Sequence, residues 1–199
     1  MWCHLLSRFG LETVSMKHLF YVNAEGGPLL CADVQVMRTW RGAISGAPDY
    51  DALCAIFDAE PHCEGTVIEV TGGHAIAWEM GGAGTADVFR DNAGIIRIVR
   101  PWLDDDITST VEALATAAAP AQAAIGELAI PSGRLAILWA PESGETIPEN
   151  GNAEVEEVRQ TSIACSAFVM RVAARRYACL HDEVALASGD ARRLTLVPS

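Results

Sequence analysis

Apolar and polar positions alternate along much of the chain, with the period of two that is typical of half-buried β-strands. The clearest example is a pair of alternating runs at residues 66–70 and 74–79, which flank the glycine-containing turn at 71–73 and predict a hairpin. Further turns are predicted at 81–84, 91–94 and 131–133. Together these signals predict strands at 18–22, 28–32, 66–70, 74–79, 95–99, 126–130, 134–140, 168–172, 177–180 and 194–197.

Three segments instead repeat apolar residues every three or four positions, which indicates amphipathic helices. Asp33 is expected to cap a short helix that runs through Trp40, and a second short helix is expected to begin at Asp49. The third and clearest helix is predicted over residues 106–119. Its apolar face would consist of Ile107, Val111, Leu114, Ala115 and Ala118.

The order of these elements indicates the fold class. Strands and a few helices mix without regular βαβ alternation, so we expect an α+β fold with a mainly antiparallel sheet, a few short helices and one longer helix near residues 106–119. Residues 16–199 are expected to form a single domain. Residues 1–15 fit poorly with the pattern of the remaining chain and are expected to be an N-terminal extension, to which we assign no role.

The charge of the chain narrows the range of partners. The 199 residues carry 14 basic and 26 acidic side chains, giving a formal net charge of -12, with mean hydropathy +0.20. Such a surface repels phosphate backbones and anionic lipids, so we expect neither a nucleic-acid nor a membrane partner, and a basic protein partner is favoured. No apolar run reaches the ~18 residues of a membrane span, and the N-terminus lacks a signal-peptide pattern. We therefore expect a cytoplasmic protein.

The sequence offers little support for catalysis. Its single lysine, Lys17, lies in no P-loop, kinase or Schiff-base motif, and no G-x-S-x-G elbow is present. Two cysteines and two histidines could bind a metal or act as nucleophiles, but their spacings match no metal-binding motif. The competing interpretation is that they are ordinary buried cysteines and surface histidines. These residues are Cys54, His62, Cys63 and His74.

Two features are candidates for partner binding. Residues 141–157 contain six acids with no base, together with Pro, Gly and Asn, and predict a long exposed loop. Its glutamates are Glu142, Glu145, Glu149, Glu154, Glu156 and Glu157. The second feature is a pair of tryptophans beside arginines, Trp40 and Trp102, since Trp and Arg anchor many interfaces. For the loop the alternative is a solvated connector, and for Trp40 it is core packing.

One region resembles a known family. It runs from Tyr21 through Gly26-Gly27-Pro28 to Trp40-Arg41-Gly42 and then to Asp49-Tyr50-Asp51 and Cys54, and it is similar to the opening of the immunity protein 21 family of bacterial polymorphic toxin systems. The resemblance implies an immunity-type α+β domain over residues 16–199 that neutralises a cognate toxin domain by direct contact. It also implies no catalysis, cofactor or metal, and a structural role for the motif residues.

Two alternatives to an immunity protein remain open. One is a small metal- or thiol-dependent hydrolase that uses Cys54, His62, Cys63 or His74. The other is an adaptor or chaperone for a secreted effector, which would share the acidic surface but bind an export segment.

Overall fold

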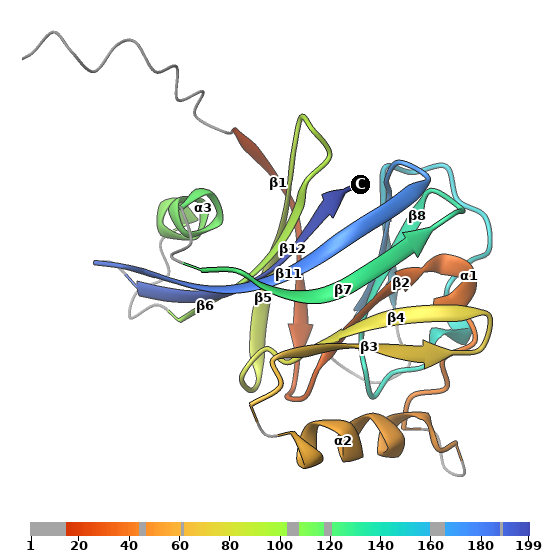
Figure 1. The fold of residues 1–199 in the computed structure, drawn as a ribbon. Coiled ribbons are helices and arrows are strands. Elements are labelled where there is room, and N and C mark those ends of the chain that lie inside the picture. The colour runs from red at the N-terminus through yellow and green to blue at the C-terminus, as the bar shows by residue number, and fades with distance from the viewer. Residues whose placement is uncertain are drawn as a thin grey trace, which may run out of the picture.

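Two six-stranded antiparallel sheets pack face to face in this protein (Figure 1). The structure is a computed structural model, and it describes residues 15–43, 47–60, 62–102, 108–117, 121–159, 166–187 and 189–199. Within these residues every pair of neighbouring strands is antiparallel. The mainly antiparallel sheet expected from the sequence is therefore confirmed.

Each sheet combines strands that are far apart in the sequence. Sheet I has the order β1 (Met16–Ala24), β5 (Gly84–Asp91), β6 (Ile96–Trp102), β12 (Gly189–Pro198), β11 (Arg175–Leu186) and β7 (Ala123–Ile130). Sheet II has the order β3 (Gly65–Val70), β4 (Gly73–Trp78), β2 (Leu29–Asp33), β8 (Arg134–Trp139), β10 (Ser166–Arg171) and β9 (Val155–Arg159). Both sheets are thus completed only by strands from the second half of the chain.

The main hydrophobic core lies between the two sheets. Alternate residues of each strand point inward, among them Val22, Ile98 and Leu196 from sheet I and Ile76 and Ile137 from sheet II, all fully buried. At one edge of the sandwich the rings of Phe20 and Phe168 stack with their centroids 4.4 Å apart.

Helices cover the outer faces of the two sheets. On sheet II, α1 (Val34–Met37) and α2 (Asp49–Ala59) enclose a second cluster that includes Leu30, Leu53 and Leu138. On sheet I, α3 (Thr108–Thr116) buries Leu114 against Val99 (Figure 1). None of the described helices combines the length and the apolar character that crossing a membrane requires.

The helices differ in length from those expected. Asp33 does cap α1, because its Oδ1 atom accepts from the Gln35 amide at 2.9 Å, but the helix ends at Met37 and not at Trp40. The longest described helix is α2, with 11 residues, and α3 has 9. Residues 106–107 and 118–119 of the predicted helix, like residues 1–14, lie outside the described residues, and Ala117 follows the end of α3.

The region that carries the family resemblance forms one packed unit. Gly27 has φ +78°, and a Cβ atom there would lie 3.2 Å from the Tyr50 hydroxyl, so the turn between β1 and β2 passes directly over α2. The Arg41 amide donates to Asp49 Oδ2 at 3.0 Å and links the two parts of the motif. Gly27, Tyr50, Arg41 and Asp49 are therefore packed together in the structure.

Candidate functional site

The acidic segment 141–157 runs mostly as a loop, as expected, but it is packed against the rest of the molecule and only part of it is exposed. It contains the 3-10 helix η1 (Gly144–Thr146) and the first residues of β9. The Gly144 amide donates to the Trp40 carbonyl at 2.9 Å, and the Ala43 amide donates to the Pro141 carbonyl at 2.8 Å. Backbone hydrogen bonds thus hold the segment against residues 40–43.

Four of the six glutamates form ion pairs with basic residues of this chain. Glu145 contacts Arg41, Glu149 lies 3.3 Å from Arg38, Glu154 contacts Arg90 and lies 3.9 Å from Lys17, and Glu156 lies 3.4 Å from Arg134. These contacts neutralise much of the local negative charge before any partner arrives.

The other two glutamates have different surroundings. Glu142 is 7% exposed, and burial, with a smaller contribution from Glu25, raises its pKa. It is therefore not an exposed contact residue. Glu157 is exposed and borders a surface hollow beside Phe20, Tyr21 and Phe168.

Trp40 is a core residue. It is 3% exposed, lies in the cluster beneath α1 and α2, and donates its indole N–H to the Ala140 carbonyl at 2.8 Å. The packing alternative for this tryptophan is therefore confirmed, and its side chain does not present a surface to a partner.

Trp102 is the most exposed of the tryptophans that the structure describes, with 38% exposure. The Arg100 guanidinium lies 5.1 Å and the Arg192 guanidinium 5.6 Å from its ring centre, distances that allow cation–π attraction. A cavity of about 550 Å³ adjoins the ring, and its wall includes Val184 and Ala191. We call Arg100, Trp102, Glu183, Asp190 and Arg192 the Trp102 surface.

The Trp102 surface continues the inner face of sheet I beyond the core. Residues 100 and 102 follow the inward-facing Ile96 and Ile98 at intervals of two, and Arg192 precedes the inward-facing Leu194 on the neighbouring strand. In Figure 1 the ends of β6, β11 and β12 extend to the left past sheet II. At these ends the loop 81–84 lies against this face, because the Arg100 guanidinium donates to the Ala83 carbonyl at 2.7 Å and a Cβ atom at Gly81 would lie 3.0 Å from the Trp102 ring.

A charged network borders this surface. His181, 4% exposed, accepts at Nδ1 from the Trp78 indole N–H at 3.1 Å, and its Nε2 contacts the Glu64 carboxylate. Arg192 links this pair to Glu183, with 3.5 Å to Glu64 and 3.1 Å to Glu183. Burial lowers the pKa of His181, and the nearby Glu64 opposes that shift.

This network has the ligand types of a metal site but not the required protonation. Among the described residues, Glu64, His181 and Glu183 form the one group of three whose ligand atoms lie within 4.8 Å of one another. An indole nitrogen only donates, so Nδ1 of neutral His181 is unprotonated and Nε2, facing Glu64, carries the proton. For Nε2 to bind a metal, its proton would have to move to Nδ1, where it would face the Trp78 indole N–H, and the Arg192 guanidinium already occupies the place of a cation. The group is therefore an internal ion-pair network.

The cysteines and histidines considered for a hydrolase do not gather into a comparable group. Cys54, on α2, shares a hydrogen bond with Tyr50, whose pKa is raised to about 12 by burial and by that bond. Cys63 donates to the Gly65 carbonyl at 3.4 Å, and His62 and His74 are exposed. Within the described part of the chain, Cys54 thus contacts a phenol that stays neutral, which cannot activate it as a nucleophile.

Sequence reasoning identified Trp102 but missed Arg192, His181 and Glu64. The missing information is strand register: in the β6–β12 pair Arg192 lies opposite Arg100, and Asp190 lies opposite Trp102. Because these strands are separated by more than 80 residues, no spacing in the sequence indicates the pairing.

No family model matches the chain, and the comparisons with curated proteins and with solved structures also find no match. We therefore infer the function from the geometry of the Trp102 surface and from the motif within residues 21–54.

Proposed function

We propose that this protein is a non-catalytic immunity protein that acts in the bacterial cytoplasm. It binds a cognate toxin domain by direct contact and covers the surface through which that toxin acts. The order of motif residues from Tyr21 to Cys54 supports the family. The Trp102 surface is the observation that carries the proposal of a protein partner.

A protein surface, more than a small molecule, suits this geometry. An exposed Trp between two Arg side chains has the residue types that contribute most to protein interfaces, and here they lie beside a cavity of about 550 Å³. We therefore assign the central contact with the toxin domain to Trp102.

In this proposal the acidic segment attracts the toxin over long range and does not form the central contact. Its glutamates carry part of the overall negative charge, which attracts a basic toxin over long range. Because most of them are paired with arginines, we assign them to steering and not to the central contact.

The test uses the full chain and the toxin domain encoded beside it. Co-expression is expected to protect cells from the toxin, and the purified pair is expected to form a stoichiometric complex. Trp102→Ala is expected to weaken that complex at least about 30-fold, as loss of a central aromatic anchor costs ~2 kcal/mol or more. Affinity is measured by calorimetry and protection by growth.

A matched control is available on β1. Tyr21 is 57% exposed, so Tyr21→Ala also removes an exposed aromatic ring, and it is expected to leave affinity unchanged. Equal affinities for the two variants would place the contact elsewhere. Failure to protect cells, or binding to an export segment in place of the toxic domain, would favour the adaptor. Turnover of a substrate by the isolated chain would favour the hydrolase.

A further inference from the structure

One cavity is lined by basic side chains, in contrast to the acidic character of the whole chain. Its volume is about 440 Å³, and it is bordered by Lys17 of β1, Arg90 of β5, Arg171 of β10 and Arg175 of β11. Four of the 14 basic residues thus line one cavity, and among the described residues Asp91 is its one acidic lining residue. The local charge is therefore opposite in sign to that of the whole molecule.

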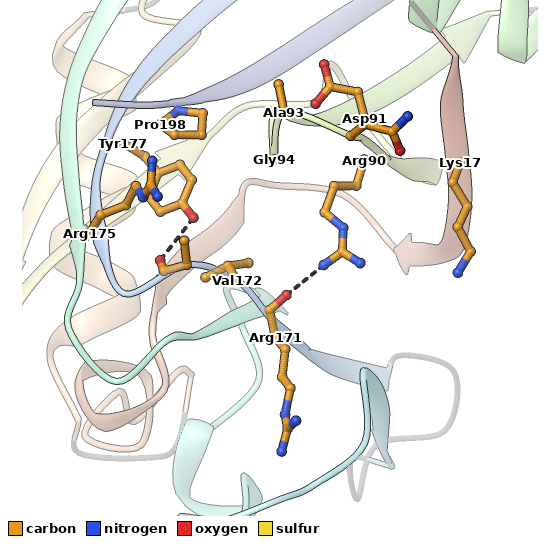
Figure 2. A pocket seen from close by; sticks show the side chains of 12 residues that line it. Lys17, Arg90, Asp91, Ala93, Gly94, Arg171, Val172, Arg175, Tyr177 and Pro198 are labelled. Carbon is orange, nitrogen blue, oxygen red and sulfur yellow. Dashed lines mark hydrogen bonds between the residues drawn. The ribbon is translucent and has the colours of Figure 1, made fainter.

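Figure 2 shows how these side chains are oriented. Arg90 donates to the Arg171 carbonyl at 2.8 Å, whereas the Arg171 side chain points away and reaches Asn152 Oδ1 at 3.3 Å. Tyr177 donates its hydroxyl to the Ala173 carbonyl at 3.0 Å. Arg90 and Arg175 both act to lower the pKa of Tyr177, although burial, the larger effect, raises it. Figure 2 shows Arg175 beside Tyr177, and Arg90 across the cavity at the Arg171 carbonyl.

The carboxylates near the cavity leave part of this charge uncompensated. Asp91 uses Oδ1 to accept from the Ile95 amide at 2.8 Å and so closes its own turn. Glu154 contacts Arg90 and lies 3.9 Å from Lys17, whose side chain is 70% exposed. For Arg175 the described part of the chain provides no ion-paired carboxylate.

We propose that this cavity binds a phosphate group on Arg175, a lining arginine without an ion-paired carboxylate among the described residues, with Arg90 and Lys17 adding positive charge from across the cavity. A guanidinium donates two parallel N–H bonds to phosphate oxygens, and a cavity of this volume has the size of a small-ligand site. The source of the group is either free inorganic phosphate or the terminal phosphate of a small phosphorylated molecule. The inference is independent of the proposed toxin contact.

The ligand is a small molecule and not a nucleic acid, because the net charge of -12 repels a polyanion approaching over a wide surface.

Glu154 is the competing internal anion, since its carboxylate already contacts Arg90. Removing the negative charge of Glu154 is therefore expected to strengthen phosphate binding.

The experiment is calorimetric titration of the full chain with inorganic phosphate and, separately, with ATP, at constant ionic strength maintained with NaCl. Saturable binding is expected in at least one arm. Arg175→Gln is expected to weaken it about tenfold or more, and Glu154→Gln to strengthen it several-fold. Binding of phosphate itself identifies the free ion as sufficient, whereas binding of ATP alone identifies a larger phosphorylated ligand.

The neighbouring residue supplies the control. Arg176 lies next to Arg175 on β11, but it pairs with Glu127 at 2.9 Å and does not line the cavity. Arg176→Gln is expected to bind phosphate like the unchanged protein, and circular dichroism verifies that each variant is folded. Equal affinities for Arg175→Gln and Arg176→Gln, or no saturable binding in either arm, would overturn the proposal.

Discussion

At the scale of single residues, the most consequential charge is the buried Arg193 of β12. Its guanidinium, 1% exposed, lies 2.6 Å from the equally buried Asp182 carboxylate of β11. It also donates to the carbonyls of Leu114 at 2.9 Å and Ala117 at 2.7 Å, which belong to the C-terminal end of α3. One side chain therefore fixes α3 to the outer face of sheet I and satisfies carbonyls that the helix leaves unpaired.

Replacing Arg193 by Met is expected to lower the free energy of unfolding by about 3–5 kcal/mol. Methionine keeps much of the side-chain volume but leaves the Asp182 carboxylate without its charged partner in a buried site. Urea unfolding followed by tryptophan fluorescence measures the change. Arg176→Met, which breaks an exposed pair with Glu127, is expected to cost at most about 1 kcal/mol. Equal losses in the two variants would show that burial of the pair is unimportant.

The contrast between Asp33 and Arg193 shows which residue roles a sequence can reveal. Asp33 caps α1 through an amide two residues away, so its role follows from local chemistry, and the prediction is confirmed. Its second oxygen accepts from the Ser132 amide at 2.8 Å, which no local rule indicates. Arg193 binds carbonyls more than 75 residues away, and only the packing of α3 on sheet I brings them together.

At the scale of elements, the acidic segment 141–157 depends on one close backbone approach. A Cβ atom at Gly144 would lie 1.8 Å from the Met37 carbonyl oxygen, so any side chain there displaces η1 from α1. Gly144→Ala is therefore expected to lower the free energy of unfolding by about 1–3 kcal/mol. It should also speed hydrogen exchange at the amides of Gly144 and Ala43, which are bonded across this contact.

Gly151 provides the control within the same segment. A Cβ atom there would meet only the ends of the Glu156 and Arg134 side chains, which can move aside at little cost. Gly151→Ala is thus expected to leave exchange at the Gly144 and Ala43 amides unchanged. Faster exchange in both variants, or in neither, would contradict the docking of this segment through Gly144.

The sequence predicted ten of the twelve described strands, missing β5 and β9, and it predicted the exposure of this segment only in part. Alternation identifies strands because burial of one face is a local property, and the turns at 71–73 and 131–133 flank strands as expected. A run of acids, in contrast, predicts exposure only when no bases face it. Here Arg38, Arg41, Arg90 and Arg134 supply the opposing charges from other elements, so the segment is docked. Trp102 could be proposed as a contact from its residue type alone. Its position at the end of sheet I depends on which strands pair, so that position could not be predicted from the sequence.

At the scale of the whole molecule, the long-range attraction of a basic partner is distinct from direct contact with the acidic segment. The net charge of -12 acts over distances limited by a screening length of about 10 Å at 0.1 M salt. A basic partner is therefore attracted by the sum of the charges, even though the segment 141–157 is locally neutralised. On the proposed function, this long-range field sets the association rate, and the Trp102 surface sets the dissociation rate.

Two double variants with the same net charge test this separation. Glu145→Lys with Glu149→Lys reverses two exposed charges in the acidic segment, and Glu69→Lys with Glu127→Lys reverses two exposed charges on β3 and β7. Both are expected to slow association with a basic toxin domain by a similar factor, on the order of tenfold at low salt, and to leave dissociation unchanged. Surface plasmon resonance at low and at high NaCl concentration measures both rates, and the difference from the unchanged protein should shrink at the higher salt. If the Glu145 and Glu149 pair alone slows association, or speeds dissociation, the acidic segment itself contacts the partner, and the division between steering and contact is wrong.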